Sequence, residues 1–294
     1  MSKNHAVKKG RENVMSKKKN PLIKPYLKWA GGKRQLLNDI RPFIPTRFTT
    51  YYEPFVGAGA VLFDLQPKRA VINDFNEQLI TTYRIIKNNV EELIVLLRDY
   101  KEKNSDEFFY AIRELDRDRE AFGKLSDIEI AARFIFMNKT CYNGLYRVNS
   151  SGLFNVPYGK YKNPMICDEP VLRAVSHYLS SNDIELHSGD FAAVLNTADR
   201  NSFVYFDPPY HSDDDTNFTG YQAGGFNAVE QTRLRDVFDE LSRRGVKCLL
   251  SNADTPFIRE LYANYTIETV MAKRAINSDA DGRGDVKEVL IRNY

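Results

Sequence analysis

One short segment of the chain places a carboxylate, two prolines and an aromatic ring directly after an apolar run. Residues 203–210 read FVYFDPPY, and the apolar half is typical of a buried strand. Proline fixes φ and donates no hydrogen bond, so Pro208 and Pro209 favour a rigid turn that presents carbonyl oxygens. Asp207 and the carbonyl of Pro208 would form a pair of acceptors suited to an amino group with two N–H donors, such as the exocyclic amine of a base. Tyr210 adds a ring that could stack on a planar ligand.

A second segment with chemical potential is a glycine turn between an apolar strand and a helix. Residues 51–63 read YYEPFVGAGAVLF, and Gly57 and Gly59 would let a ligand approach the N–H donors at the start of the helix. Asp74 ends the next apolar strand, where an acid of a doubly wound sheet can accept hydrogen bonds from ribose hydroxyls. Alone, the glycine pair fits a tight turn without a ligand equally well, and Asp74 alone fits a simple strand-end cap better than a ligand contact. Their order favours an adenosine-type ligand, although the third glycine of the dinucleotide fingerprint is missing.

The elements that must position these residues alternate between strand and helix on both sides of a different central region. Apolar periodicity predicts one helical run over residues 77–100 and further helices over 105–119, 128–137 and 229–244. Strands are predicted at 70–74, 203–206 and 246–251, with a closing pair at 266–270 and 288–292. Residues 141–164 are rich in Gly, Asn, Ser, Pro and Tyr, which favours loops and a β-hairpin. The pattern predicts an α/β sheet interrupted by an insert from about residue 76 to residue 182.

Composition and charge limit the class of protein. The 294 residues are 43% apolar, which is enough for a sizeable core, and a net charge of +3 indicates no partner. Residues 1–34 nevertheless hold eleven Lys or Arg residues against one acid, Glu12, and residues 1–20 are expected to form a basic, disordered tail. Three scattered cysteines favour neither a disulfide framework nor a zinc site. No apolar run approaches the roughly 20 residues of a membrane span, so we expect a cytoplasmic protein.

Several motifs in a fixed order make the chain resemble the Dam family of DNA adenine N6-methyltransferases, and equally the adenine methyltransferases of GATC-specific restriction systems. The motifs are LKWAGGKRQLL (27–37), YYEPFVGAGAVLF (51–63), NDFN (73–76), NGLYRVN (143–149), FNVPYGKYKNP (154–164), GDF (189–191) and FDPPY (206–210). The resemblance implies a Rossmann-like S-adenosylmethionine-dependent methyltransferase sheet with an inserted, mainly helical plus β-hairpin DNA-recognition domain. Residues 21–75 and 183–294 would form the catalytic domain, and residues 76–182 the target-recognition domain.

The resemblance also implies the cofactor S-adenosylmethionine and the residues that handle it. The cofactor-binding positions are Trp29, Lys33, Glu53, Phe55, Gly57, Gly59, Asp74, Asp190, Phe191 and Asp207. By residue type alone, Trp29 would be a core residue and Asp190 an ordinary loop acid. The catalytic positions are Asp207, Pro208, Pro209 and Tyr210. Asp207 and the carbonyl of Pro208 would hold the N6 amine of an adenine that has been flipped out of the duplex onto Tyr210.

Double-stranded DNA is the substrate that the resemblance implies. The DNA-binding positions are Lys28, Tyr142, Asn143, Leu145, Arg147, Pro157 and Tyr161. Residues 130–167 contain Arg133, Lys139, Arg147, Lys160 and Lys162 without any acid, and aromatic rings lie between them. This composition fits a groove reader and a solvated basic loop equally well, so the assignment rests on the resemblance.

The resemblance implies a GATC recognition site. Arg147 is predicted to contact one guanine of that site through two hydrogen bonds, and Lys28 is predicted to contact the first guanine. Residues 211–226 are expected to form a flap that orders on DNA, and Arg283 to approach a phosphate.

Other functions stay open at the level of sequence. Transfer to cytosine N4, to an RNA base or to a glutamine side chain would use related chemistry. Asp207 argues against a glutamine enzyme, and the NGLYR and FNVPYG motifs argue against both the glutamine and the cytosine N4 enzymes. A non-catalytic DNA-binding relative would be expected to have lost the DPPY or GxG motif, and both are intact. A restriction endonuclease for the same site is a functional partner consistent with the resemblance, without a stable complex, and a solitary enzyme fits equally well.

Overall fold

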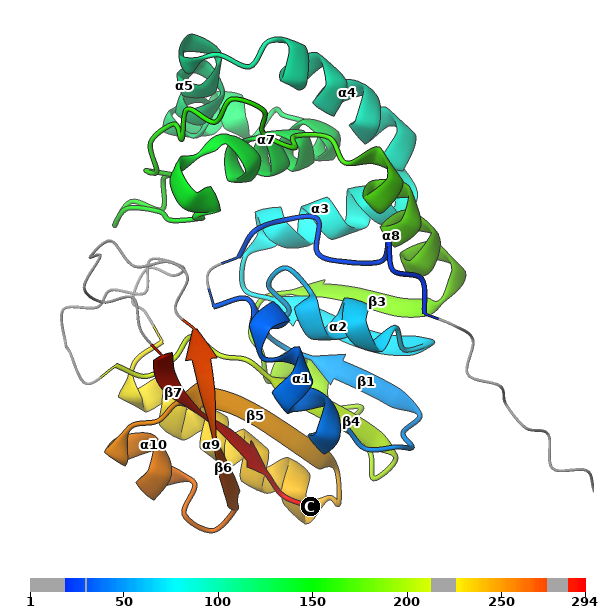
Figure 1. Ribbon diagram of the computed structural model, residues 1–294, viewed down its shortest axis with the longest axis vertical. Helices are drawn as coiled ribbons and strands as arrows, with labels where there is room; N and C mark the ends of the chain where they lie inside the picture. The colour runs from blue at the N-terminus through cyan, green and yellow to red at the C-terminus, as the bar shows by residue number, and fades with distance from the viewer. Residues whose placement is uncertain (1–18, 30, 213–225, 274–284) are drawn as a thin grey trace, which may run out of the picture.

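The strands form one mixed sheet in the computed structural model, which describes residues 19–29, 31–212, 226–273 and 285–294 (Figure 1). The strand order is β3-β2-β1-β4-β5-β7-β6. The strands are β1 (Thr50–Glu53), β2 (Arg69–Asp74), β3 (Asp183–Ser188), β4 (Ser202–Phe206), β5 (Lys247–Ala253), β6 (Thr266–Lys273) and β7 (Asp285–Arg292). Strands β1 to β5 pair in parallel, and β7 pairs antiparallel with both β5 and β6. The predicted α/β sheet and its closing strand pair are confirmed.

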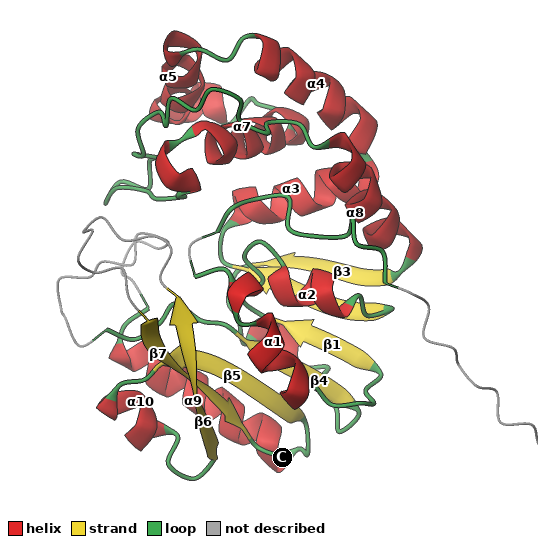
Figure 2. Ribbon diagram, in the orientation of Figure 1, coloured by secondary structure: helices red, strands yellow, loops and turns green. Residues whose placement is uncertain are grey.

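Helices cover the sheet and build a separate layer beyond it. They are α1 (Leu37–Ile40), α2 (Ala60–Leu65), α3 (Glu77–Asn88), α4 (Val90–Glu102), α5 (Asp106–Glu114), α6 (Arg119–Phe122), α7 (Asp127–Thr140), α8 (Glu169–Ser181), α9 (Ala228–Arg243) and α10 (Pro256–Leu261). Figure 2 shows α4, α5 and α7 grouped at the end of the molecule away from the strands. No helix within the described ranges combines the length and the apolar character that crossing a membrane requires.

The sheet buries side chains on both faces because successive residues of a strand point in opposite directions. In β4, Phe203 and Tyr205 belong to the core cluster that includes α2, α3 and α7. Val204 and Phe206, from the same strand, belong to the cluster beneath α9 and α10. All four side chains are inaccessible to solvent. A strand buried on both faces reads as a continuous apolar run, which is why FVYF was recognisable in the sequence.

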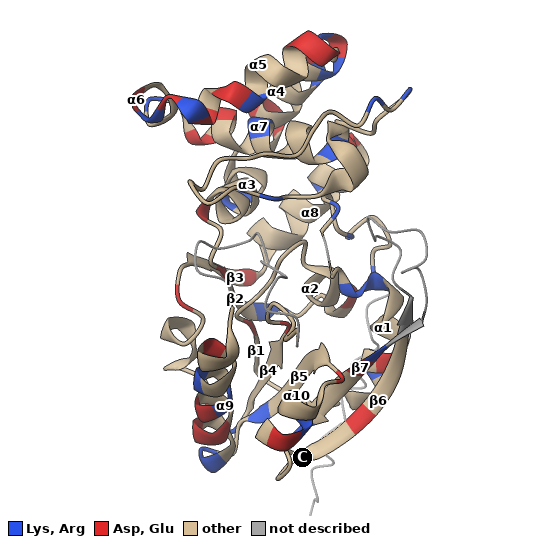
Figure 3. Cartoon of the chain, turned by 90° about the vertical axis from the view of Figure 1, so that its left-hand side faces the viewer, with Lys and Arg blue, Asp and Glu red and all other residues tan. Residues whose placement is uncertain are grey.

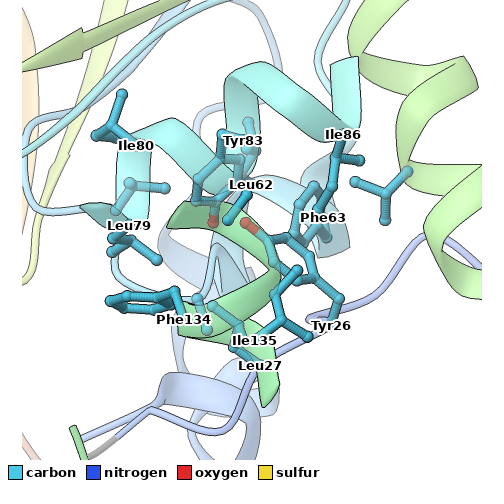
Figure 4. Close-up of a cluster of buried hydrophobic side chains, with 14 of the residues drawn as sticks. Tyr26, Leu27, Leu62, Phe63, Leu79, Ile80, Tyr83, Ile86, Phe134 and Ile135 are labelled. Atoms are coloured by element: carbon cyan, nitrogen blue, oxygen red, sulfur yellow. The ribbon is translucent and has the colours of Figure 1, made fainter. Parts of the chain in front are cut away.

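The larger core cluster continues from the sheet into the helical layer. Figure 4 shows side chains of the N-terminal segment, α2, α3 and α7 converging, among them Tyr26, Phe63, Tyr83 and Phe134. The ring centroid of Tyr26 lies 5.5 Å from that of Tyr83 and 6.5 Å from that of Phe63. The Tyr26 hydroxyl forms a 2.6 Å hydrogen bond with the hydroxyl of Thr82, which satisfies both buried groups. The insert and the sheet therefore share one apolar interior.

Two local predictions were wrong in detail. The helical run over residues 77–100 is two helices, α3 and α4, because Asn89 leaves the helical region with φ −137° and ψ 38°. The predicted β-hairpin within residues 141–164 is reduced to two isolated antiparallel bridges, Cys141 with Tyr158 and Val148 with Phe154. Proline has no N–H for a strand ladder, and several residues of this segment have positive φ, so regular strands do not form.

Candidate active site and nucleic-acid interface

The motifs meet at one edge of the sheet because the parallel strands all end on the same side (Figure 1). The glycine turn follows β1, Asp74 ends β2, and the DPPY motif follows β4. Lys33 reaches this edge from the N-terminal segment, in a 3₁₀ turn at Lys33–Gln35. Segments that are far apart in the chain therefore contribute to one site.

Asp207 is held by a cation and a hydroxyl. The Nζ of Lys33 lies 2.8 Å from Asp207 Oδ1, and the Lys33 side chain is only 4% exposed. Ser251 donates its hydroxyl to the same oxygen at 3.0 Å, and Lys33 also donates to the carbonyl of Gly31 at 2.6 Å. Burial raises the pKa of Asp207 above its usual value, against the opposing effects of Lys33 and Ser251. These contacts fix the orientation of the carboxylate before any ligand binds.

Tyr210 is anchored through both its ring and its hydroxyl. The Nζ of Lys33 lies 4.5 Å from the ring centroid, which is a cation–π distance. The hydroxyl donates to Glu288 Oε2 of β7 at 2.6 Å. Burial and the neighbouring carboxylates, Asp207 first, raise the pKa of Tyr210 well above its usual value, so the phenol stays protonated and remains a donor.

Two buried amides support the turn that follows β4. Gln231 of α9 donates to the carbonyl of Pro209 at 2.9 Å, and Asn252 of β5 donates to Gln231 Oε1 at 3.0 Å. The side-chain oxygen of Asn252 accepts from the backbone N–H of His211 at 3.0 Å. Both amide residues are inaccessible to solvent. A fully paired buried network of this kind makes the DPPY turn rigid.

The glycine turn binds the carboxylate of Asp74. The N–H of Gly57 donates to Asp74 Oδ2 at 2.9 Å, and the N–H of Asn76 donates to Oδ1 at 3.0 Å. Burial raises the pKa of Asp74 to about 6, although these N–H groups oppose it. Gly57 has φ +49°, and a Cβ there would lie 2.7 Å from Trp29 Cδ1, so only glycine fits against the indole ring. Trp29 therefore lies against the turn.

Two of the expected cofactor-binding residues face the core. Glu53 is 2% exposed and accepts a hydrogen bond from the Tyr51 hydroxyl at 2.9 Å. Burial raises the pKa of Glu53 well above its usual value. A Cβ at Gly59, where φ is +71°, would lie 2.7 Å from the Tyr83 hydroxyl and 2.9 Å from the Phe63 ring. Close packing explains why residue 59 is glycine.

The segment after β3 adds an aromatic wall with a charged rim. Phe191 packs against Phe55 with 5.1 Å between ring centroids, and against Phe226 with 6.0 Å. Arg233 lies 4.4 Å from the centroid of Phe191 and forms an ion pair with Asp190. Arg233 comes from α9, which carries acidic and basic residues along its length (Figure 3). The three rings of this wall are tilted or perpendicular to one another, and Asp190 adds a carboxylate at the rim.

Helix α7 connects the N-terminal segment to the loop that follows the helix. The Oδ1 of Asn138 accepts from the backbone N–H of Lys28 at 2.9 Å. Its Nδ2 donates to the carbonyls of Lys28 at 2.8 Å and Gly144 at 3.1 Å. The Nζ of Lys28 lies 5.1 Å from the ring centroid of Tyr161, whose hydroxyl accepts from the N–H of Asn143 at 2.8 Å. Lys28, Asn143 and Tyr161, three expected DNA-binding residues from different segments, are thus in contact with one another.

The remaining expected DNA-binding residues lie along the same loop. Arg147 is exposed, and its Nε donates to Asn155 Oδ1 at 2.9 Å. Tyr142 is 54% exposed, and its backbone N–H donates to the carbonyl of Pro157 at 2.8 Å. Leu145 donates its N–H to the carbonyl of Tyr142 at 3.3 Å.

Arg133 was counted with the basic residues of the insert, and that interpretation was wrong. Its side chain is 1% exposed and forms a 2.9 Å ion pair with Asp116. It also donates to the carbonyls of Ile112 and Arg113, both at 2.9 Å. Lys139 is half-buried, and burial lowers its pKa to about 8. A count of charges cannot separate structural cations from surface cations.

Sequence reasoning missed several residues that position the site. They are Ser251, Glu288, Gln231, Asn252, Arg233 and Asn138. The sequence did contain a signal for Ser251, because the predicted strand at 246–251 ends at this residue and the predicted strand at 203–206 ends next to Asp207. Glu288 had none, because only the pairing of β7 with β5 brings it near Tyr210. Residues 213–225 of the expected flap, Arg283 and residues 1–18 of the expected tail lie outside the described residues.

Comparisons with known proteins give a consistent result. Residues 29–276 match the family described as D12 class N6 adenine-specific DNA methyltransferase. The chain is 44% identical over 283 residues to the Type II methyltransferase M1.LlaDCHI of Lactococcus lactis subsp. cremoris, covering 96% of this chain and 99% of that protein. It is 43% identical over 291 residues to the Type II methyltransferase M.MjaIII of Methanocaldococcus jannaschii, covering 92% and 99%. It is 35% identical over 269 residues to the DNA adenine methylase of Escherichia coli K12, covering 90% and 93%.

Proposed function

Because the chain belongs to the D12 class of N6 adenine-specific DNA methyltransferases, as its motifs predicted, we propose that it methylates a flipped adenine within GATC in duplex DNA. The methyl donor that we propose is S-adenosylmethionine, which methyltransferases generally use. The observation that carries the proposal is the convergence of Asp207, Lys33 and Tyr210 next to the glycine turn. An acceptor, a cation and an aromatic face meet there at the carboxyl edge of a parallel sheet.

The residues at this edge fit S-adenosylmethionine. Glycine at residue 57 lets the indole ring of Trp29 lie directly against the turn, where a Cβ would clash. Asp74 offers a carboxylate for ribose hydroxyls, and the aromatic wall of Phe55 and Phe191 offers a slot for an adenine ring, with Asp190 at its rim. When bound, this cofactor supplies a methyl group on a sulfonium, which is already a strong leaving group.

The chain's own contribution is to orient the amine. An adenine amine is conjugated with its ring and is a poor nucleophile. Acceptors for both of its protons, which we propose are Asp207 Oδ2 and the carbonyl of Pro208, favour a pyramidal nitrogen with its lone pair aimed at the methyl group. Lys33 and Ser251 hold Oδ1 of the same carboxylate, and Gln231 holds the following turn. Catalysis would rest on orientation and preorganised electrostatics.

The same site is suited to receive a flipped base. A stacked adenine cannot reach the end of β4, so the enzyme would extrude it and stack it on Tyr210. Glu288 holds the Tyr210 hydroxyl and thereby sets the plane of the ring. Arg147 would read a guanine in the groove, supported by Asn155, and Lys28 would contact the first guanine of the site.

Further proposals concern organisation and context. We propose that residues 21–75 and 183–294 form the catalytic domain and that residues 76–182 form the target-recognition domain. Residues 77–181 contribute helices, turns and loops but no strand of the sheet, which supports this division. We also propose a cytoplasmic location and a functional relationship with a restriction endonuclease of the same specificity. Names of the Lactococcus and Methanocaldococcus relatives support the latter.

A restriction-protection assay tests the function. Plasmid DNA from a methylation-deficient host is incubated with the full chain and S-adenosylmethionine, and then digested with nucleases that GATC adenine methylation blocks or licenses. We expect protection from the first and cutting by the second. Unchanged digestion would exclude GATC, and absence of tritium transfer to any DNA would exclude the activity. Asp207→Ala is the matched inactive control, which we expect to bind the duplex about as well as the wild type.

A further inference from the structure

We infer that Tyr146 couples the cofactor pocket to the DNA-reading loop, so that occupancy of either site strengthens binding at the other. The inference rests on the proposed roles of Trp29 and Arg147. Tyr146 immediately precedes Arg147 in the chain, and its ring contacts Trp29. Tyr146 lies within the NGLYRVN motif but is not among the residues expected to contact DNA or the cofactor. Its contacts instead form two separate connections between the sites.

The first connection is made of aromatic rings. The centroid of Tyr146 lies 5.8 Å from that of Trp29, with 18° between the planes, and 4.9 Å from that of Phe134, with 28°. Trp29 and Phe134 also stack on each other at 6.2 Å. Phe134 is 1% exposed and belongs to α7, so it forms a fixed floor beneath the other two rings. A shift of Trp29 therefore has to be accommodated by Tyr146.

Trp29 is in turn packed against the glycine turn. A Cβ at Gly57 would lie 2.7 Å from Trp29 Cδ1 and 2.9 Å from its Nε1, so no slack separates ring and backbone. The carbonyl of Gly57 accepts from the Tyr83 hydroxyl at 2.9 Å, and its N–H donates to Asp74. A ligand that presses on this turn therefore has a direct mechanical contact with the indole ring.

The second connection is polar. Burial raises the pKa of Tyr146, and the side chain of Asn76, which faces its hydroxyl, opposes that rise. Asn76 also caps α3 by accepting from the N–H of Leu79 at 3.1 Å, and its own N–H donates to Asp74 at 3.0 Å. Asn76 thus binds the carboxylate proposed to bind ribose, and its side chain faces the tyrosine that precedes Arg147.

The loop holds Tyr146 from its other side. The Tyr146 ring lies 5.7 Å from that of Phe154. The carbonyl of Arg147 accepts from the N–H of Asn155 at 3.1 Å, and Asn155 also binds the Arg147 guanidinium. Movement of Tyr146 would therefore change the aim of Arg147. Coupling between two binding sites is reciprocal, so the same factor must appear in both binding constants.

The chain supplies its own probe, because Trp29 is the only tryptophan. Its fluorescence measures the Kd of S-adenosylhomocysteine, which binds without turnover, with and without a saturating GATC duplex. Fluorescence anisotropy of a labelled duplex measures the Kd of DNA with and without S-adenosylhomocysteine. For the wild-type chain we expect each ligand to tighten the other by the same factor, about fivefold or more.

Two substitutions separate the connections. Tyr146→Leu removes both, and we expect its coupling factor to fall below about twofold. Tyr146→Phe keeps the ring but loses the hydroxyl that faces Asn76, and we expect a factor between those of the wild type and Tyr146→Leu. Tyr110→Leu is the matched control, because Tyr110 lies on α5 against Phe109 and Arg113, and it should keep the wild-type factor.

The outcomes distinguish this inference from the proposed function. A wild-type coupling factor near one would overturn the inference, as would a folded Tyr146→Leu chain with the full factor. If Tyr146→Leu does not fold by circular dichroism, an undiminished factor in Tyr146→Phe together with a normal Tyr110→Leu control overturns it. A wild-type chain that transfers no methyl group while both ligands still couple would instead overturn the proposed function alone.

Discussion

Asp207 is partly buried and has a cationic partner in Lys33, and the balance between burial and that charge sets the pH at which its carboxylate takes up a proton. Burial raises its pKa and Lys33 lowers it, with the net result above the usual value for aspartic acid. A protonated Asp207 cannot accept both a structural hydrogen bond and the amine proton as effectively. Methyl transfer should therefore fall as the pH falls through this raised pKa, and it should be lost at a higher pH than for an exposed aspartate.

Lys33→Met should move this acid limb of the rate profile to higher pH, because the charge that favours the ionised carboxylate is gone. The check is kcat at saturating S-adenosylmethionine and DNA, measured between about pH 5 and pH 9. Lys87→Met is the control, since Lys87 binds the carbonyl of Ile184 at the far edge of the sheet. An acid limb that stays in place in Lys33→Met would contradict the assigned role of Lys33.

Tyr210 and Glu288 should act as one unit, because the only role proposed for Glu288 is to hold the phenol. Tyr210→Phe and Glu288→Gln should each lower kcat about tenfold, the size expected for a hydrogen bond to a charged group. The double substitution should cost little more than either single one. Independent, multiplying losses in this cycle would show that Glu288 acts by another route.

Arg147 should determine specificity more than affinity. Arg147→Ala is expected to lose about 1–3 kcal/mol of discrimination at one guanine, which is the value of a bidentate contact. Competition between GATC duplexes and duplexes altered at single positions measures this loss. Lys124→Ala serves as the control, because that lysine is exposed and pairs with Glu120, which is not among the expected DNA-binding residues. Unaltered discrimination would remove Arg147 from its proposed role.

At the scale of elements, α7 is the part that connects the two ligand sites. The helix begins with a capping box between Ser126 and Glu129, and a Ser followed three residues later by a Glu is the sequence pattern typical of such a start. From that start, Phe134 and Asn138 fall one helical turn apart on the same face. Phe134 therefore supports Trp29, while Asn138 binds the backbone of Lys28, the residue before Trp29.

Asn138→Asp should weaken the fold as well as DNA recognition. The new carboxylate oxygen would face the carbonyls of Lys28 and Gly144, which have the Asn138 amide as their donor. A buried carbonyl at Gly144 and a partly buried one at Lys28, both left without that donor, should reduce the free energy of unfolding by about 1–3 kcal/mol. Urea denaturation measures this value. The exposed substitution Asn196→Asp should change it by less than about 0.5 kcal/mol, and equal effects would contradict the prediction.

Elements were predictable where local pattern and tertiary role agree. FVYF is apolar throughout because β4 is central and covered on both faces, and the two glycines and Asp74 mark strand ends. The break at Asn89 was not predictable, because apolar residues continue at helical spacing through it. The core of the site followed from motifs, whereas Ser251, Glu288 and Gln231 reach it through the sheet order and the packing of α9. The positions of these three residues in the sequence therefore do not predict their contacts with the site.

At the scale of the whole molecule, the buried core is continuous from the sheet to the helical layer. Tyr26, Phe63, Tyr83 and Phe134 belong to the same cluster as Tyr205 of the sheet. Neither part can expose its side of this cluster without loss of apolar burial in the other. The division into two functional regions therefore does not imply two independent folding units.

Thermal unfolding should accordingly show one calorimetric transition for both regions. S-adenosylhomocysteine at about 100 times its Kd should stabilise the entire transition by about 2.7 kcal/mol. Scanning calorimetry with and without this ligand checks both statements. Two separable transitions, with only one responding to the ligand, would show that the shared core does not make the regions cooperative.

Strand β7 is the last strand of the described chain, yet it lies between β5 and β6 and carries Glu288 to the phenol of Tyr210. Strands β5 and β6 are both synthesised before β7, so the position between them in the sheet stays unfilled until β7 has been made. Until then, Tyr210 lacks the carboxylate of Glu288. The phenol at the proposed catalytic edge is therefore positioned only after β7 has paired with both of its neighbours.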